Sequence, residues 1–232
     1  MLKAIALNGS PRKEKGDTAL VLSSFLEGLR ENDVPVELHY ASRLKVKPCA
    51  CGDMRCWYDS PGECCIKDDM QLLYPKLKEA DFLILATPVY IPLPGAMQNI
   101  INRLCPLVEP YLEFRQSRTR ARFRQDVNIK NFILISTGGW WEKENMSTVV
   151  RIVEELAQNT NVEFGGAILR PHAFLMKTDG KVNKEGNKIL NAVKNAGCEL
   201  IQNGQMNQET LDFISHPLIS EEELRRRYNQ LL

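Results

Sequence analysis

Apolar residues in this chain fall into short continuous runs that alternate with stretches of helical periodicity. Five runs predict buried strands, at residues 3–7, 34–39, 81–86, 131–136 and 162–169. Apolar residues recurring every three or four positions predict helices at 17–29, 69–79, 97–107, 147–158 and 184–202. Alternation of strands with helices is typical of an α/β protein, so we expect a doubly wound, five-stranded parallel sheet in three α/β/α layers.

Two segments interrupt this alternation and one follows it. We call residues 47–66 the cysteine loop and residues 109–128 the arginine segment. Residues 1–204 are expected to form one domain that includes both segments. Residues 205–232, the tail, are expected to be helical, with a short helix opening at Ser220, and to pack on the domain itself or on a neighbour.

Charge and hydropathy exclude several classes of function. The chain has 30 Lys and Arg against 29 Asp and Glu, a formal net charge of +1, and lacks the broad basic field that nucleic-acid or membrane-surface binding requires. The longest apolar stretch, Phe82 to Met97, contains three prolines and is not a membrane span. The apolar start, residues 1–7, is too short for a signal peptide, so a cytoplasmic protein is expected.

Ligands of doubly wound sheets bind beyond the carboxyl ends of the strands, which directs attention to the loops that follow them. The first, Asn8 to Thr18, offers the hydroxyls of Ser10 and Thr18, the charge of Arg12 and a helix N-terminus, a combination suited to a phosphate dianion. It contains neither a P-loop nor a GxGxxG sequence. The alternative is a polar turn capped by Asp17 or Thr18.

Two later loops have features that suit a flat polar ring. Prolines make the segment from Thr87 to Gly95 a rigid wall, where Tyr90 and Ile91 could cover a heterocycle. The segment from Thr137 to Trp141 combines two glycines, which permit close backbone approach, with two indoles. Each could be an ordinary loop with structural aromatic residues, but three such loops at one end of a sheet favour a binding site.

Cysteine usage is the irregular feature of the composition. Of seven cysteines, five lie within 17 positions, and the spacing contains no CxxC: Cys49, Cys51, Cys56, Cys64 and Cys65. In a reducing compartment, clustered cysteines favour metal binding or redox chemistry over disulfides. An iron–sulfur cluster, structural zinc and metal-free thiols all remain open, although zinc sites normally have paired CxxC-like spacings. Cys105 and Cys198 lie on helical patterns and are expected to be small buried hydrophobic residues.

Other polar groups leave alternatives open. The arginine segment has five guanidinium groups in ten residues, which predict either a solvated or subunit-bridging excursion, or a site for an acidic partner or nicotinamide nucleotide phosphates: Arg115, Arg118, Arg120, Arg122 and Arg124. His172 could contact substrate or be a structural histidine. No Ser/His/Asp arrangement or paired carboxylates support hydrolysis, so no catalytic acid–base residue is assigned.

Several motifs together resemble those of the flavodoxin-like NAD(P)H-dependent FMN reductases, and within them the iron–sulfur flavoproteins. These are Gly9-Ser10-Pro11-Arg12 with Gly16-Asp17-Thr18, Thr87-Pro88-Val89-Tyr90 with Gln98 and Asn102-Arg103-Leu104, Ile66-Lys67-Asp68-Asp69-Met70, and Pro217-Leu218-Ile219-Ser220-Glu221-Glu222. The resemblance implies a flavodoxin-like fold and a homodimer or homotetramer. Asp17 stands where the family usually has Asn, and a carboxylate repels a phosphate unless it caps the helix by accepting backbone N–H bonds.

The resemblance also implies two cofactor sites. FMN would be held at its phosphate by Ser10, Arg12, Asp17 and Thr18, and around its ring by Pro88, Val89, Tyr90, Ile91, Thr137, Gly138, Gly139 and Trp140. A [4Fe–4S] cluster would be held by Cys49, Cys51, Cys56 and Cys64, with Cys65 as the alternative to Cys64.

We therefore expect an FMN-dependent oxidoreductase or electron-transfer flavoprotein. It would exchange electrons between NAD(P)H, or another small-molecule or protein donor, and an acceptor. One alternative is an NAD(P)H-dependent FMN or quinone reductase without a cluster. A further alternative is a non-enzymatic flavodoxin-like carrier or redox sensor.

Overall fold

A five-stranded parallel sheet forms the centre of the computed structural model, which describes residues 1–230. Its strand order is β2-β1-β3-β6-β7, with every neighbouring pair parallel. The strands are β1 (Ala4–Asn8), β2 (Val36–Tyr40), β3 (Phe82–Pro88), β6 (Asn131–Thr137) and β7 (Glu163–Arg170). The predicted doubly wound sheet is confirmed, and its order reverses between β1 and β3.

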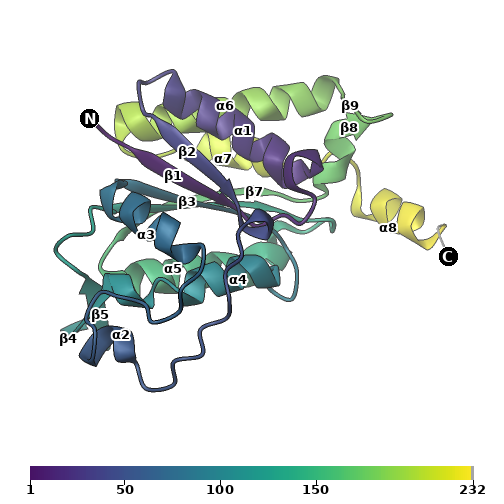
Figure 1. Cartoon of the computed structure of the whole chain (residues 1–232). Coiled ribbons are helices and arrows are strands. Elements are labelled where there is room, and N and C mark those ends of the chain that lie inside the picture. The colour runs from purple at the N-terminus through teal and green to yellow at the C-terminus, as the bar shows by residue number, and fades with distance from the viewer. Residues whose placement is uncertain (231–232) are drawn as a thin grey trace.

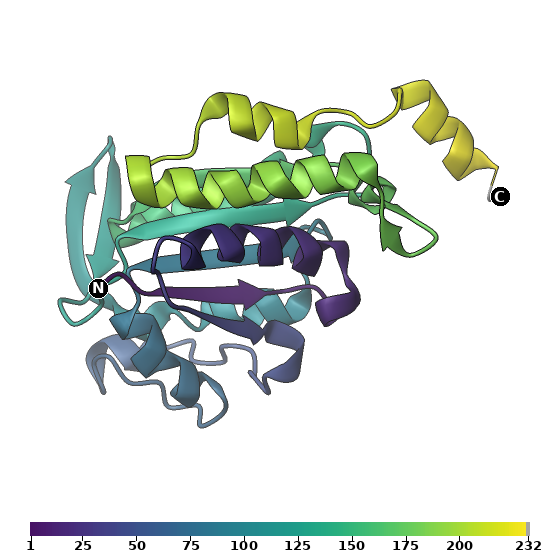
Figure 2. The same cartoon turned by 90° about the horizontal axis from the view of Figure 1, so that it is seen from above.

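Helices cover both faces of the sheet, making three layers (Figure 1, Figure 2). One face carries α1 (Asp17–Arg30), α6 (Lys184–Asn203) and α7 (Gln208–Ser215), and the other carries α3 (Met70–Glu79), α4 (Gly95–Asn102) and α5 (Ser147–Thr160). Each face has its own buried apolar core, around Phe25 and Ile189 on one side and Leu73 and Val153 on the other. The apolar periodicity of the sequence therefore places the helices correctly, because burial of the apolar stripe is what stabilises each of them.

One predicted helix is shorter than expected. The prediction was a helix over 97–107, but α4 ends at Asn102 and a 3₁₀ turn follows at Cys105–Leu107. Pro106 lies in that turn, and proline cannot donate the backbone hydrogen bond that continuation of the helix would need.

The arginine segment forms a structure that the periodicity did not predict. Strands β4 (Val108–Arg115) and β5 (Arg118–Phe123) pair as an antiparallel hairpin that packs against α5. Its arginines pair with acidic groups of the same chain: Arg122 Nη1 lies 2.9 Å from Glu113 Oε1, and Arg120 Nη1 lies 2.7 Å from Glu155 Oε2. Alternating charges along one face of the hairpin thus serve as cross-strand and strand–helix ion pairs.

The remaining elements are short. They are α2 (Arg55–Tyr58) in the cysteine loop, β8 (Lys177–Thr178) paired with β9 (Lys181–Val182), α8 (Glu221–Asn229), and 3₁₀ turns at 13–15, 41–43, 143–146 and 173–176. In the tail, the Ser220 hydroxyl caps α8 by accepting a hydrogen bond from the Glu223 backbone at 3.2 Å. Within residues 1–230, no helix has the length and apolar character needed to cross a membrane.

Candidate functional site

The loops following β1, β3 and β6 are joined by backbone hydrogen bonds where the strand order reverses. Gly9 N donates to Ala86 O at 2.8 Å, and Val89 N donates to Thr137 O at 2.9 Å. The predicted phosphate loop and the two predicted ring loops therefore meet at one end of the sheet. This is the place where doubly wound folds bind ligands.

The predicted phosphate loop is buried at its two ends, Asn8 to Ser10 and Gly16 to Thr18, and exposed between them. The Ser10 backbone N–H donates to Asn8 Oδ1 at 2.8 Å, which fixes the turn, and the Ser10 side chain is buried. A Cβ on Gly16 would lie 2.7 Å from Ser10 Oγ, so any residue other than glycine would displace this hydroxyl. Thr18 and Thr137, both buried, share a hydrogen bond of 2.7 Å between their hydroxyls, which links this loop to the loop after β6.

Asp17 lies at the start of α1 between two cations. Its carboxylate accepts hydrogen bonds from the Arg12 guanidinium and from Lys177 Nζ, the latter at 2.9 Å. Burial alone would raise the pKa of this carboxyl, but Lys177 and Arg12 outweigh it and hold the pKa below its usual value. Lys177 was not predicted as a member of the site, because it lies 160 residues from Asp17 in the chain.

The ring side of the site exposes apolar and aromatic groups to solvent. Tyr90 is 51% exposed, Trp140 is 66% exposed, and Ile91 is fully exposed. Val89 is fixed by its bond to Thr137, and Gly138 N donates to Arg170 O at 3.0 Å. Exposed apolar side chains on backbone held in this way can cover a ligand without a costly rearrangement.

Arg170 and His172 hold the loop after β6 in place through hydrogen bonds. The His172 backbone N–H donates to Trp140 O at 3.1 Å, while His172 Nε2 accepts from Arg170 Nη2 at 2.9 Å and from Leu218 N at 3.0 Å. Burial, and then the nearby charge of Arg170, lowers the pKa of His172 to about 4. Burial also lowers the pKa of Arg170 to about 10. His172 is therefore a buried, neutral structural histidine that holds the ring loop.

The tail reaches the same end of the sheet. Figure 1 shows α8 beyond the carboxyl ends of the strands. Trp141 Nε1 donates to Ile219 O at 2.8 Å, and the Tyr228 hydroxyl donates to Gly139 O at 3.4 Å. Ile219 and Tyr228 of the tail thus contact the predicted ring loop, while most of α8 is exposed.

A buried ion pair closes the base of the cysteine loop. Arg103, at the end of α4, donates to both carboxylate oxygens of Asp68 at 2.7 and 3.0 Å, and the two side chains are 1% and 3% exposed. The same guanidinium donates to Lys47 O at 2.9 Å and to Ile66 O at 3.2 Å, which are the two ends of the loop. Asn102-Arg103-Leu104 and Ile66-Lys67-Asp68-Asp69-Met70 are therefore two halves of one structural clamp.

The thiols of the cysteine loop lie in separate small groups. Cys51 Sγ and Cys65 Sγ are 2.9 Å apart, and this hydrogen bond, followed by burial, raises the pKa of Cys51 to about 12. Cys56 lies beside Cys105, and burial, with that neighbour second, raises its pKa to about 12. Cys64 is buried, whereas Cys49 is exposed.

No three Cys, His, Asp or Glu side chains in residues 1–230 converge on a common metal position. Cys105 was expected to be a buried hydrophobic residue, but it is half-buried next to a thiol of the loop.

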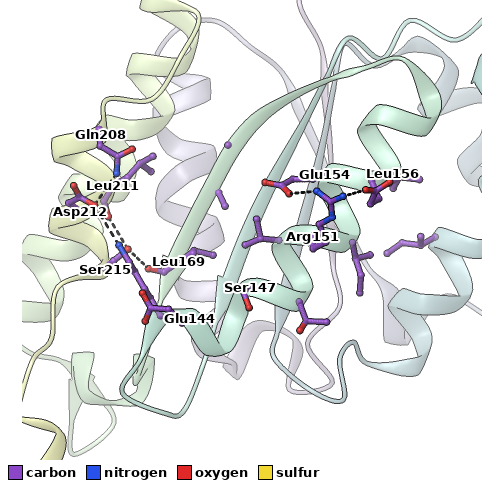
Figure 3. A pocket seen from close by; sticks show the side chains of 18 of the residues that line it. Glu144, Ser147, Arg151, Glu154, Leu156, Leu169, Gln208, Leu211, Asp212 and Ser215 are labelled. Atoms are coloured by element: carbon purple, nitrogen blue, oxygen red, sulfur yellow. Dashed lines mark hydrogen bonds and ion pairs between the residues drawn. The ribbon is translucent and has the colours of Figure 1, made fainter. Parts of the chain in front are cut away.

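A groove lies at the edge of the sheet, away from the strand ends. A groove of about 1170 Å³ runs along the free edge of β7 between α5 and α7, with the Arg151–Glu154 ion pair on one wall and Ser215 donating to Leu169 O at 2.9 Å on the other (Figure 3). None of the predicted flavin residues lines it. It is a feature of the sheet edge, separate from the strand ends.

The strand order and the covering helices define a flavodoxin-like fold, with the predicted phosphate and ring loops together at one end of its sheet. A family model described as NADPH-dependent FMN reductase matches residues 2–178, and the chain belongs to this family. Over 107 residues it is 35% identical to an iron-sulfur flavoprotein of Archaeoglobus fulgidus, a match covering 45% of this chain and 46% of the relative. The chain spans about half the length of the curated relatives it matches.

Solved structures resemble the fold across nearly the whole chain. An NAD(P)H:quinone oxidoreductase from Methanothermobacter marburgensis has a TM-score of 0.60 at 15% identity, covering 87% of this chain and 96% of that one. An FMN-dependent NADH-azoreductase from Bacillus anthracis, in complex with FMN, has a TM-score of 0.57 at 11% identity, covering 86% and 99%. At such identities the likeness concerns the fold alone.

Proposed function

We propose that this chain binds FMN beyond the carboxyl ends of β1, β3 and β6 and acts as an FMN-dependent oxidoreductase with NAD(P)H as electron donor. The observation that carries this proposal is the hydrogen bond between Thr18 and Thr137, 2.7 Å long and buried. It joins a loop suited to a phosphate to a loop suited to a ring. The family to which the chain belongs supports the same cofactor.

Different residues would contact the phosphate and the ring of FMN. Ser10, Arg12, Thr18 and the start of α1 would hold the phosphate, with Asp17 engaged by cations. Pro88 to Ile91 and Thr137 to Trp140 would surround the ring, where Tyr90 and Trp140 limit access of water. FMN, when bound, supplies hydride acceptance and electron transfer, so the chain needs only to place and shield it. No side chain is assigned as an acid–base catalyst.

The visible spectrum of the purified protein and uptake of FMN by the apoprotein test this proposal. We expect a yellow protein that oxidises NAD(P)H with a quinone or ferric acceptor. A colourless protein that takes up no FMN would refute the proposal. FMN binding without turnover would instead identify a carrier or redox sensor.

We further propose that the cysteine loop holds a [4Fe–4S] cluster through Cys49, Cys51, Cys56 and Cys64. The donor type suits iron, since five thiols lie on one loop whose ends are clamped, and relatives named iron-sulfur flavoproteins support it. Binding requires these four thiols, which do not converge on one position in the described residues, to turn toward one centre and lose their protons. Gly52, with no neighbour within 4 Å of an added Cβ, leaves the tip of the loop room to turn.

A cluster-free reductase is the second candidate, and the 2.9 Å contact between Cys51 and Cys65 favours it. Iron and acid-labile sulfide are measured after anaerobic reconstitution of the wild type and of Cys64→Ser, Cys65→Ser and a Cys198→Ser control. A loss of iron confined to Cys64→Ser supports the proposed ligand set, and a loss confined to Cys65→Ser replaces Cys64 by Cys65. Absence of iron from the wild type supports the second candidate.

We also propose a cytoplasmic homodimer or homotetramer, as the family resemblance implies. Three large apolar side chains are exposed on two elements in contact, Leu112 and Phe114 on β4 and Tyr58 on α2, and this exposure supports contact with a second copy. Light scattering on the purified protein gives the mass directly, and a monomer of 26.4 kDa would contradict the proposal.

A further inference from the structure

Lys177 contacts the predicted phosphate loop although it was not predicted to belong to the site. It comes from β8, 160 residues along the chain from Asp17, yet its Nζ lies 2.9 Å from Asp17 Oδ1. Its side chain is 24% exposed and that of Asp17 is 8% exposed, whereas the Arg12 side chain is 63% exposed. The Lys177–Asp17 pair is thus the more sheltered of the two contacts that Asp17 makes.

The backbone that presents Lys177 is fixed. Asn183 N donates to Met176 O at 3.0 Å and Asn183 Nδ2 donates to Leu175 O at 2.9 Å, which anchors the segment just before the lysine. A Cβ on Gly186 would lie 2.3 Å from Met176 O, so the first turn of α6 packs directly on this segment. Lys177 therefore approaches the loop from a rigid support, and less side-chain entropy is lost when it binds an anion.

Charge explains why a carboxylate can be present at a phosphate site. Asp17 with Arg12 alone would be neutral, and a carboxylate beside a dianion is repulsive. Lys177 restores one net positive charge, which adds to the positive end of α1. The neighbouring Glu14 does not cancel this charge, because it pairs with Arg43 at 2.6 Å.

We propose that Lys177 is a phosphate-binding residue of the flavin site and that Asp17 holds Lys177 and Arg12 together as a two-cation clamp for the phosphate monoester. This inference rests on the proposed function, since it concerns the FMN phosphate. It assigns Asp17 a positioning role in place of direct contact with the phosphate.

The affinity of the apoprotein for FMN and for riboflavin, measured by quenching of flavin fluorescence, tests the clamp. Riboflavin has the same ring but no phosphate. We expect Lys177→Met to weaken FMN binding by about tenfold to a hundredfold, as loss of a charge-assisted contact does, and to change riboflavin binding less than about twofold. Lys177→Arg should keep most of the FMN affinity. Lys181→Met, which removes a lysine from the paired strand β9, is the matched control and should leave both affinities unchanged.

A double-mutant cycle separates the clamp from a simple ion pair. In the Asp17→Asn background, Lys177→Met should still weaken FMN binding more than riboflavin binding, because the contact between Lys177 and the phosphate is lost, although by less than in the wild type, because no unpaired carboxylate remains. A lysine that only neutralised Asp17 would give no loss of FMN affinity in that background. Equal weakening of FMN and riboflavin by Lys177→Met, or an unchanged FMN affinity, would overturn this inference alone. A wild-type apoprotein that binds neither flavin would overturn the proposed function with it.

Discussion

The proposed flavin end of the sheet, formed by the loops after β1, β3 and β6, and the cysteine loop both follow strands, but they are organised in opposite ways. At the flavin end the polar groups themselves are buried and paired, as with Thr18 and Thr137. In the cysteine loop the base is buried and paired through Arg103 and Asp68, while the thiols range from buried, at Cys56 and Cys64, to exposed, at Cys49 and Cys65. The first region is preorganised at the groups proposed to bind the ligand. The second is preorganised only at its base.

This difference has a physical consequence. A preorganised cradle loses little entropy when it binds, so its ligand needs only to match its charge and shape. A loop held at its base and open at its tip can adapt to a metal centre that itself orders the ligands. Four experiments test this contrast, in order of decreasing expected effect.

Arg103→Met should have the largest effect on stability. Removing one partner of a buried ion pair leaves Asp68 uncompensated, at a cost of about 3–5 kcal/mol in the free energy of unfolding. Lys76→Met is the control, since Lys76 pairs with Glu37 at the surface and such pairs contribute about 1 kcal/mol or less. Urea unfolding gives both values. Equal losses of stability would mean that the ion pair between Arg103 and Asp68 does not hold the cysteine loop.

His172 should make the flavin end sensitive to acid. Because burial lowers its folded-state pKa to about 4, from 6.5, the unfolded chain binds a proton that the folded chain refuses between these pH values. Stability should therefore fall as pH drops from 6.5 to 4, by up to about 3 kcal/mol.

Urea unfolding of the wild type and of His172→Gln across this range measures the effect. The glutamine keeps an acceptor for the Leu218 backbone N–H but does not titrate, so its stability should fall less. Parallel pH profiles for the two proteins would contradict a buried neutral histidine.

Gly16→Ala and Gly52→Ala compare the two loops directly. The added Cβ at Gly16 would lie 2.7 Å from Ser10 Oγ, whereas at Gly52 it meets nothing within 4 Å. We expect Gly16→Ala to weaken FMN binding about tenfold, the effect of displacing one hydrogen-bond donor, and Gly52→Ala to leave it unchanged. An FMN titration of both apoproteins suffices, and equal affinities would show that the phosphate loop is as adaptable as the cysteine loop.

Two tryptophan substitutions should give the smallest effects on stability, and each should loosen a different region. Trp57→Phe removes the indole bond to Cys105 O, 3.0 Å long, and Trp141→Phe removes the bond to Ile219 O. Each should cost about 1 kcal/mol of stability. Alkylation of Cys56 and Cys105 should accelerate only in Trp57→Phe, and amide exchange of the tail only in Trp141→Phe. Acceleration of both in one variant would mean that the two regions are coupled.

The local pattern of apolar residues was sufficient to predict the central sheet and the helices that cover it. The five apolar runs correspond to the five parallel strands, and the helical periodicity locates the helices that cover them, because burial of apolar surface depends on spacings that are visible in sequence. The pattern failed at the arginine segment, where the partners of Arg120 and Arg122 are acidic groups on another strand and on α5. It also overran the end of α4, where Pro106 favours a 3₁₀ turn.

The sequence by itself determined the fold class, the loops at the binding end and the presence of clustered thiols, since each depends on residues near one another in the chain. Only the tertiary structure decided which charges meet. Arg103 and Asp68 are 35 residues apart, and Lys177 and Asp17 are 160 apart. Electrostatic pairing acts between neighbours in space, and folding brings these groups together through elements whose own formation does not depend on the charges.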